Sequence, residues 1–198
     1  MSRTSRFVRL LILAAAAAGV FAATALAQDG RELPPEVRAQ YARDLKEVAA
    51  LVKDRQFASA VPKLDALLAQ RPREAQARFL KGVVQTEQGQ AAAAIATFQA
   101  LIEDYPELPE PYNNLAVLYA QRGDLESARA ALESALKTSP DWALAHENLG
   151  DVHVRLAATH YDRAARLDKD NKTAVGKLAL ARELLAPRPA AAPAPAKP

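Results

Sequence analysis

The chain has 198 residues, no cysteine, and 26 Lys and Arg side chains against 23 Asp and Glu. The lack of cysteine excludes disulfides, a lipid-modified cysteine and cysteine-ligated zinc, so packing must stabilise the fold. Residues 1–27 hold three of the basic side chains and no acidic one, so the rest of the chain is balanced at 23 against 23. This neutral balance gives no reason to expect nucleic acid or an anionic lipid surface as a partner.

Residues 1–27 have the features of a signal peptide. A start with three arginines precedes an apolar, alanine-rich stretch, and Ala25 and Ala27 flank Leu26 at its end. This ending is typical of a cleavage site, and we expect cleavage after Ala27 and a periplasmic or secreted protein. A transmembrane anchor is the alternative, but the apolar stretch is close to the lower length limit for spanning a bilayer, and acidic residues follow it. We therefore expect no stable membrane insertion after cleavage.

After a polar linker, residues 28–35, the sequence repeats with a period of 34 residues. The residues that recur at this interval are Pro72, Pro106 and Pro140; Ala60, Ala94 and Ala128; Leu64, Phe98 and Leu132; Gly82, Ala116 and Gly150; and Gly89 and Gly123. A period of this length, made of two amphipathic stretches, predicts an array of helical hairpins. Its small residues would let two helices approach closely, and its large apolar residues would fill the space between them.

Three regular hairpins are predicted at about residues 37–72, 75–106 and 109–140, within a repeat domain of residues 36–186. In the first hairpin, apolar residues at helical spacing run from Val37 to Val52. Its second helix is predicted from about Phe57 to Gln70. It contains Pro62, which removes a hydrogen bond inside a helix and is tolerable if the helix proper begins near Ser59. In the third hairpin, Asp124 is expected to cap the second helix.

The fourth unit, residues 141–171, departs from the period. Gly150 is in register, but Asp162 stands at the alanine position and Arg166 at the aromatic position, and a shift of five residues restores the pattern. The turn between the two helices is therefore predicted to be deleted, which leaves one long or kinked helix at about 141–167. A last helix at about 172–185 is expected to cap the open end of the array.

The C-terminal residues 187–198 are rich in proline and alanine and contain five prolines. Such a composition forbids a regular helix or strand, and it predicts a disordered, polyproline-like tail. A solvated spacer is the favoured interpretation of this tail. The alternative is that the tail docks into a groove that binds proline-rich peptides.

The third hairpin resembles the tetratricopeptide repeat (TPR) pattern. The matching residues are Tyr112, Leu115, Ala116, Tyr119, Gly123, Ala128, Leu132, Ala135 and Pro140. The second hairpin matches at fewer positions and the first mainly in its second helix, so the resemblance covers about residues 37–171. It implies an all-α, TPR-type α-solenoid of antiparallel hairpins, with an irregular last repeat and a C-terminal capping helix. The chain also resembles small secreted or periplasmic bacterial TPR proteins of uncharacterised role.

The same resemblance implies a binding groove, because the first helix of each TPR hairpin lines a concave face. The implied groove residues are Gln76, Phe79, Val83, Thr86, Glu110, Asn113, Val117, Gln121, Leu144, Glu147, Asp151 and Arg155. Their mixed character favours a peptide with an apolar anchor and basic or amide groups, since Glu147 and Asp151 would repel a carboxylate. The alternative for each residue is an ordinary solvated helix surface.

Three histidines, His146, His153 and His160, follow one another at intervals of seven residues. Seven residues advance about 10.5 Å along a helix, too far for ligands of one zinc ion, so we predict no metal site. The sequence also lacks a glycine-rich phosphate loop, and we predict no cofactor. His146 and His153 stand where Tyr112 and Tyr119 stand one repeat earlier, and we expect them to pack. No catalytic motif occurs in the sequence, and the protein is predicted not to be an enzyme.

Two non-enzymatic functions stay open at this point. The first is an adaptor or scaffold that binds a protein or peptide partner in its groove. The second is a self-associating structural or assembly factor for an envelope complex, which would form a homo-oligomer through a repeat edge or the long fourth helix. A role as an accessory to an enzyme is a third and weaker alternative.

Overall fold

The computed structural model describes residues 34–186, and this range contains eight α-helices and no strand. The predicted signal peptide, most of the linker and the proline-rich tail lie outside the described residues. None of the helices in residues 34–186 combines the length and apolar character that crossing a bilayer requires. The chain divides into two compact units between His146 and Glu147.

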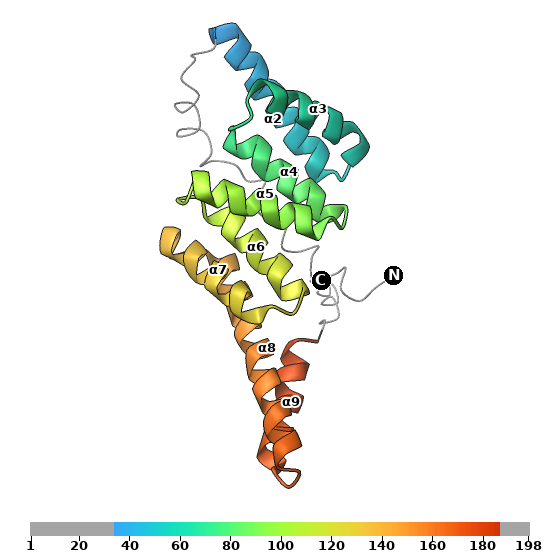
Figure 1. The fold of residues 1–198 in the computed structure, drawn as a ribbon, viewed down its shortest axis with the longest axis vertical. Coiled ribbons are helices and arrows are strands. Elements are labelled where there is room, and N and C mark those ends of the chain that lie inside the picture. Colours follow the sequence, from blue (N-terminus) through green and yellow to red (C-terminus); the bar gives the residue numbers. More distant parts are fainter. Residues whose placement is uncertain (1–33, 187–198) are drawn as a thin grey trace, which may run out of the picture. The chain divides into compact units, whose positions relative to one another are not determined.

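The first unit consists of successive helix pairs. Its helices are α2 (Pro35–Lys53), α3 (Phe57–Gln70), α4 (Ala75–Glu87), α5 (Ala91–Asp104), α6 (Pro109–Gln121) and α7 (Leu125–Thr138), followed by the first turn of α8 (Ala143–Leu167). From α2 to α7 each helix packs against the next, and the first helices of the pairs also contact one another, α2 with α4 and α4 with α6 (Figure 1). This arrangement confirms the predicted all-α array of antiparallel hairpins.

Local sequence explains where the helices of the first unit end and restart. Gly89 and Gly123 follow α4 and α6 with φ angles of 75° and 81°, a left-handed conformation that glycine adopts without steric cost. Asp124 caps α7 as predicted, because its carboxylate accepts a 3.1 Å hydrogen bond from the backbone N–H of Ser127. Hydrogen bonding from the Ser127 side chain and backbone lowers the pKa of the Asp124 carboxyl.

Arg55 occupies the position of these glycines in the first hairpin. It stands 34 residues before Gly89 and keeps the left-handed conformation, with φ at 60°. For a residue with a Cβ this conformation costs about 1–2 kcal/mol. Two side-chain contacts offset the cost: an ion pair with the largely buried carboxylate of Glu87, and a guanidinium placed 5.5 Å from the centre of the Phe57 ring. The side chain of Arg55 thus links this turn to the end of α4.

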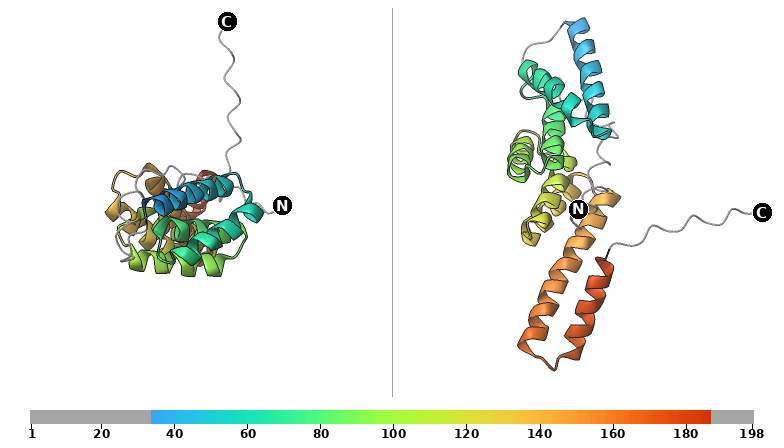
Figure 2. Two further views of the ribbon diagram at one scale, coloured as in Figure 1. Left: turned by 90° about the horizontal axis from the view of Figure 1, so that it is seen from above. Right: turned by 90° about the vertical axis from the view of Figure 1, so that its right-hand side faces the viewer.

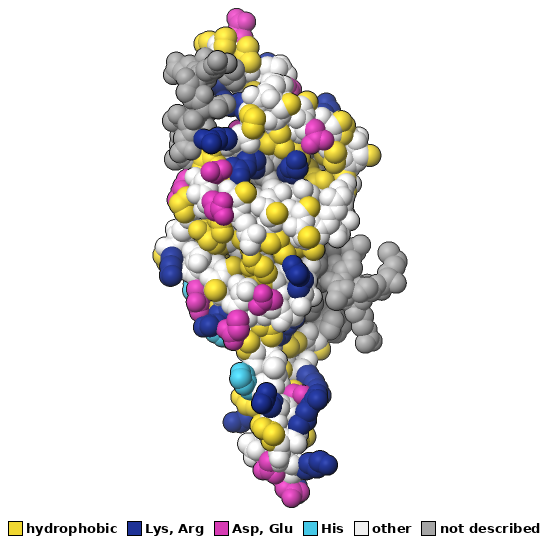
Figure 3. All heavy atoms as spheres, viewed as in Figure 1, with side chains coloured by type: hydrophobic (Ala, Val, Ile, Leu, Met, Phe, Trp, Pro, Cys, Tyr) yellow, Lys and Arg dark blue, Asp and Glu magenta, His cyan; other side chains and the backbone are white. Residues whose placement is uncertain are grey.

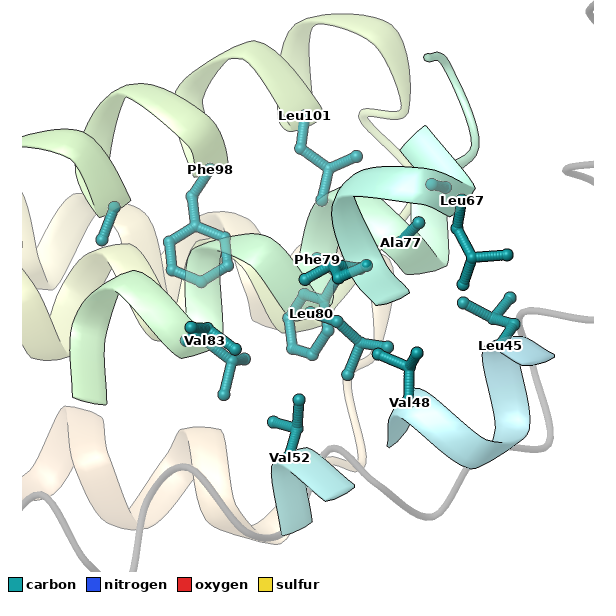
Figure 4. Packing of buried hydrophobic residues seen from close by; sticks show 14 of the residues in the cluster. Leu45, Val48, Val52, Leu67, Ala77, Phe79, Leu80, Val83, Phe98 and Leu101 are labelled. Atoms are coloured by element: carbon teal, nitrogen blue, oxygen red, sulfur yellow. The ribbon is translucent and has the colours of Figure 1, made fainter. Parts of the chain in front are cut away.

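Large and small side chains meet in the core of the first unit. Figure 4 shows Val48 and Val52 of α2 directed toward Leu80 and Val83 of α4, with Phe98 of α5 nearby. Phe98 is fully buried. The small residues that recur every 34 positions pack against these large side chains. Three of these small residues are fully buried: Ala60, Ala94 and Ala128. In the first unit these three alanine positions therefore mark places where helices cross, as the sequence predicted.

The second unit is a helical hairpin, formed by the rest of α8 and by α9 (Lys172–Leu184). α8 is a single helix of 25 residues, and its second half lies antiparallel to α9 (Figure 2). Two contacts join the helices: Arg182 lies 3.6 Å from the Asp162 carboxylate, and the Lys177 ammonium lies 5.6 Å from the centre of the Tyr161 ring. The capping role expected of this last helix stays a prediction.

α3 spans the predicted range, Phe57–Gln70, but the condition under which Pro62 was expected to be tolerable is not met. The helix begins at Phe57 rather than near Ser59, so Pro62 lies inside it instead of in its first turn. The hydrogen bond that Pro62 lacks would have reached the carbonyl oxygen of Ala58. Pro62 and Ala58 are both exposed, so water can satisfy that carbonyl, and the helix tolerates the proline.

Two expectations about packing are also wrong. The apolar spacing predicts Val37 on the buried face of α2, but it is 43% exposed, because residues 34–40 at the start of the helix are all exposed. The period predicts Gly150 at a close helix crossing, yet a Cβ built on it meets nothing within 4 Å. The regular repeat places its second helix at that crossing, and the deleted turn of the fourth unit removes it.

Candidate functional site

The predicted groove residues of the first unit lie on α4 and α6, with Leu144 at the start of α8. We call the surface that these residues are predicted to form the inner face. The contacts of α4 with α2 and with α6 align the first helices of successive pairs and so set the position of this face. Buried members of the set are Phe79, Val83, Asn113 and Val117. Half-exposed or exposed members are Gln76, Thr86, Glu110, Gln121 and Leu144.

The buried members belong to the core. Phe79 is 3% exposed and its ring centre lies 5.7 Å from that of Phe98, while Asn113 is 1% exposed. Figure 4 shows Phe79 and Val83 among the side chains of the neighbouring helices. The apolar centre predicted for the groove is therefore used largely for packing between repeats. Contact of these side chains with a partner stays a prediction.

The open part of the inner face is mainly polar. The Thr86 hydroxyl donates a 2.8 Å hydrogen bond to the carbonyl oxygen of Gly82, within α4. Gln76 is half-exposed and Gln121 is exposed, so both amides reach solvent. An amide both donates and accepts hydrogen bonds, which suits it to the backbone of an extended peptide.

Glu110 is the acidic group of the inner face in the first unit. Burial raises the pKa of its carboxyl, and a hydrogen bond to its own backbone N–H opposes this rise. Its Oε2 atom is enclosed and has no hydrogen-bond partner among the described residues. An ionised oxygen in such a place is costly, and a cationic group would offset that cost. Among the predicted inner-face residues, Glu110 thus has a carboxylate oxygen that the described residues leave unsatisfied.

Three more of the predicted groove residues lie on the part of α8 that belongs to the second unit. Glu147 is exposed, whereas Asp151 and Arg155 are half-exposed. Burial, and then the charge of Glu147, raises the pKa of the Asp151 carboxyl, and Arg155 opposes the rise. Burial also lowers the pKa of the Arg155 guanidinium, which Asp151 opposes. Asp151 and Arg155 are four residues apart and share a helix face, where their opposite charges partly compensate.

Sequence comparison identifies the repeat. Two models described as tetratricopeptide repeat match residues 45–109 and 85–149, which together span more than half of the chain. The chain belongs to the tetratricopeptide repeat family. This membership confirms the resemblance that the 34-residue pattern carries, and it agrees with the all-α solenoid of helix pairs in the first unit.

Solved structures with the same fold include other TPR proteins. A thermophilic TPR protein of Thermus thermophilus is similar with a TM-score of 0.55 and 19% identity, over 73% of this chain and 82% of that one. YrrB, described as a TPR protein with an unusual peptide-binding site, is similar with a TM-score of 0.50 and 27% identity, over 56% and 59%.

A chain in the structure of Naa15/Naa10 bound to HypK-THB is also similar, with a TM-score of 0.54 and 16% identity. The match covers 74% of this chain but only 23% of that larger one. At this identity the likeness shows the fold alone. A comparison with curated protein sequences finds no match.

The histidines of α8 do not pack as expected. His146, His153 and His160 are all exposed, and Nε2 of His146 lies 2.8 Å from the carbonyl oxygen of Pro140. A regular TPR hairpin would have its second helix near these positions, but α8 continues where that helix would begin. Within residues 34–186, no group of three or more His, Asp or Glu side chains could hold a metal ion.

A polar cluster where α2, α3 and α4 meet was missed by the sequence-based interpretation. Arg71 is 7% exposed, and its guanidinium lies 5.6 Å from the centre of the Tyr41 ring. Glu74 caps α4 by accepting a 2.6 Å hydrogen bond from the backbone N–H of Ala77, and burial raises the pKa of its carboxyl. The cluster joins helices of the array. No local signal reveals it, because Arg71 is buried only through helices distant in sequence.

Proposed function

We propose that this TPR protein is a non-enzymatic adaptor or scaffold, periplasmic or secreted, that binds a protein or peptide partner on the inner face of its first unit. TPR proteins are in general protein-interaction modules rather than catalysts, and YrrB is described by its peptide-binding site. The residues offered to the partner are the open members of the inner face, Gln76, Thr86, Glu110, Gln121 and Leu144.

The environment of Glu110 carries this proposal. An enclosed carboxylate oxygen without a hydrogen-bond partner favours a cationic ligand, so the partner brings a Lys or Arg side chain to this position. Gln76 occupies the equivalent place one repeat earlier, 34 residues before Glu110. Its amide supplies the neighbouring hydrogen bonds to the partner's backbone. The partner segment is therefore basic rather than acidic.

The proposed location rests on the features of residues 1–27. The mass of the protein purified from its native host is expected to correspond to a chain that starts at Gln28. Fractionation of the cells is expected to place this shortened chain in the periplasm or the medium. An intact chain that retains residues 1–27 in the membrane fraction would instead support the anchor.

Reversal of the charge at Glu110 is expected to weaken partner binding by about tenfold or more, because a lysine there repels the basic side chain of the partner. The partner is first captured in intact cells by a photo-crosslinking residue at the exposed position Gln121, and it is identified by mass spectrometry. Its affinity is then measured by calorimetry for the unmodified chain and for Glu110→Lys.

Glu107→Lys is the matched control, since Glu107 is exposed and lies in the turn before α6. This variant has the same net charge as Glu110→Lys and is expected to bind normally. A crosslinking residue at Lys137, on the exposed side of α7, controls for non-specific capture. Equal capture from both positions, or equal affinity of both variants, would show that the inner face is not the binding site.

A further inference from the structure

The second unit exposes large apolar side chains that a terminal helix normally avoids. Leu167 is 78% exposed, Val175 51%, and Leu180 and Leu184 are each 62% exposed. Figure 3 shows hydrophobic side chains between Lys and Arg side chains over α8 and α9, in the lower part of the view. The last helix of a repeat array ordinarily turns a polar side to solvent. α9 instead mixes the exposed apolar side chains of Val175, Leu180 and Leu184 with exposed charged side chains, while its other side buries Ala174, Leu178 and Ala181.

Gly176 is a second feature of α9 that the hairpin leaves unexplained. It is exposed in the middle of the helix, and a Cβ built on it meets nothing within 4 Å. Glycine at such a position costs about 1 kcal/mol of helix stability relative to alanine. The exposed Ala179 and Leu180 stand three and four residues further along, on the same side of the helix. Small residues next to a protruding leucine let another helix approach closely.

The charged residues at the two ends of α9 are a third feature that the hairpin leaves unexplained. Lys172 is the first residue of the helix and Glu183 is the last but one. Both oppose the helix dipole, which favours acidic groups at the N-terminus and basic groups at the C-terminus. Both are exposed, and neither forms an ion pair within the described residues. An antiparallel neighbour of the same sequence would bring the lysine of one helix to the glutamate of the other.

We propose that α9 binds α9 of a second copy of this chain as an antiparallel pair, through Lys172, Gly176, Ala179, Leu180 and Glu183. In a two-fold arrangement centred near Leu178, Leu180 of one copy lies over Gly176 of the other, since each is two residues from the centre. Glu183 and Lys172 are five and six residues from that centre, so the opposite charges meet at both ends. The surface is thus complementary to itself in size and in charge.

The expected dimer is weak. α9 is about 20 Å long, and a contact between two such helices buries less than the roughly 1,200 Å² at which stable interfaces begin. The proposal is independent of the inner face and of any partner bound there. A loss of dimerisation would therefore leave the proposed adaptor function untouched, and the reverse also holds.

Sedimentation equilibrium of the full chain over a concentration series tests the proposal. A monomer–dimer equilibrium is expected, and Leu180→Glu is expected to raise its dissociation constant by about tenfold or more. Val37→Glu is the matched control, since Val37 is also an exposed apolar side chain but lies on α2. A chain that stays monomeric at every concentration, or a dimer that Leu180→Glu leaves intact, would overturn the proposal.

An exchange of charges tests the antiparallel register. Lys172→Glu alone and Glu183→Lys alone each place like charges opposite one another and weaken the dimer, whereas the double variant restores it. Each single change also improves the match to the helix dipole, so circular dichroism is expected to show α9 no less helical. If a single change weakened the dimer only by disturbing α9, the helicity measured by circular dichroism would fall together with dimerisation. Failure of the double variant to restore the dimer would contradict the proposed pairing.

Discussion

Replacement of Phe98 by alanine is expected to lower the free energy of unfolding by about 3–5 kcal/mol. The Phe98 side chain is fully buried, and its ring lies against Phe79 of the preceding helix. Its removal leaves a cavity where α4 and α5 cross, which the surrounding helices can fill only in part. Denaturant unfolding followed by circular dichroism measures the loss.

Phe57→Ala is the control for this change. It deletes the same side chain at a half-exposed position, where water replaces part of the lost contact. A smaller loss is expected, although the contact with Arg55 is also removed. Equal losses at the two positions would mean that the crossing of α4 and α5 is not the centre of the core. Repeat arrays can unfold in parts. The unfolding curve is therefore recorded at two wavelengths, and a free energy is assigned only if the two curves coincide.

Two glycines of one repeat column are expected to respond in opposite directions to alanine. A Cβ on Gly82 would lie 2.5 Å from Cε1 of Phe98, so Gly82→Ala overpacks the crossing and lowers stability by about 1–3 kcal/mol. Gly150 has open space around it and lies inside α8, so Gly150→Ala raises stability by about 0.5–1 kcal/mol. Thermal and denaturant unfolding of each variant measure whether its free energy of unfolding rises or falls relative to the unmodified chain.

The source of the Gly82 penalty is tested by a second substitution. In a Phe98→Leu background the ring atoms that meet the new Cβ are gone, so Gly82→Ala is expected to cost much less there. A penalty that is unchanged in this background would show that the clash is not with Phe98. A loss of stability in Gly150→Ala would show that this glycine, too, stands at a close helix crossing.

Much of the fold could be predicted from the sequence, because the repeat depends on side-chain size at fixed intervals. Ala60, Ala94 and Ala128 recur where helices cross, and Asp124 shows its capping role through its position after a glycine turn. The tolerance of α3 for a proline in its interior could not be predicted in the same way. Pro62 has a clear penalty inside a helix, but that penalty depends on whether water reaches the carbonyl of Ala58, which only the packed structure decides.

The candidate site could be predicted only in part. The resemblance to the TPR pattern predicted which positions of α4 and α6 form the inner face, but it could not separate Phe79, which is buried, from Gln76, which is half-exposed. The enclosed oxygen of Glu110 was likewise not predictable, since it depends on neighbouring helices. The histidines of α8 were misjudged for a related reason: their expected packing required a helix that the fourth unit lacks.

The sequence by itself determined the helix pairs, their order and the repeat family, because a 34-residue period requires each amphipathic pair to bury its apolar side against the next. Only the tertiary structure decided which side chains stay in contact with water. The solvent exposure of a side chain depends on neighbours that are far away along the chain, so the local sequence pattern does not predict it. The enclosed oxygen of Glu110 and the exposed leucines of α9 both depend on such distant neighbours.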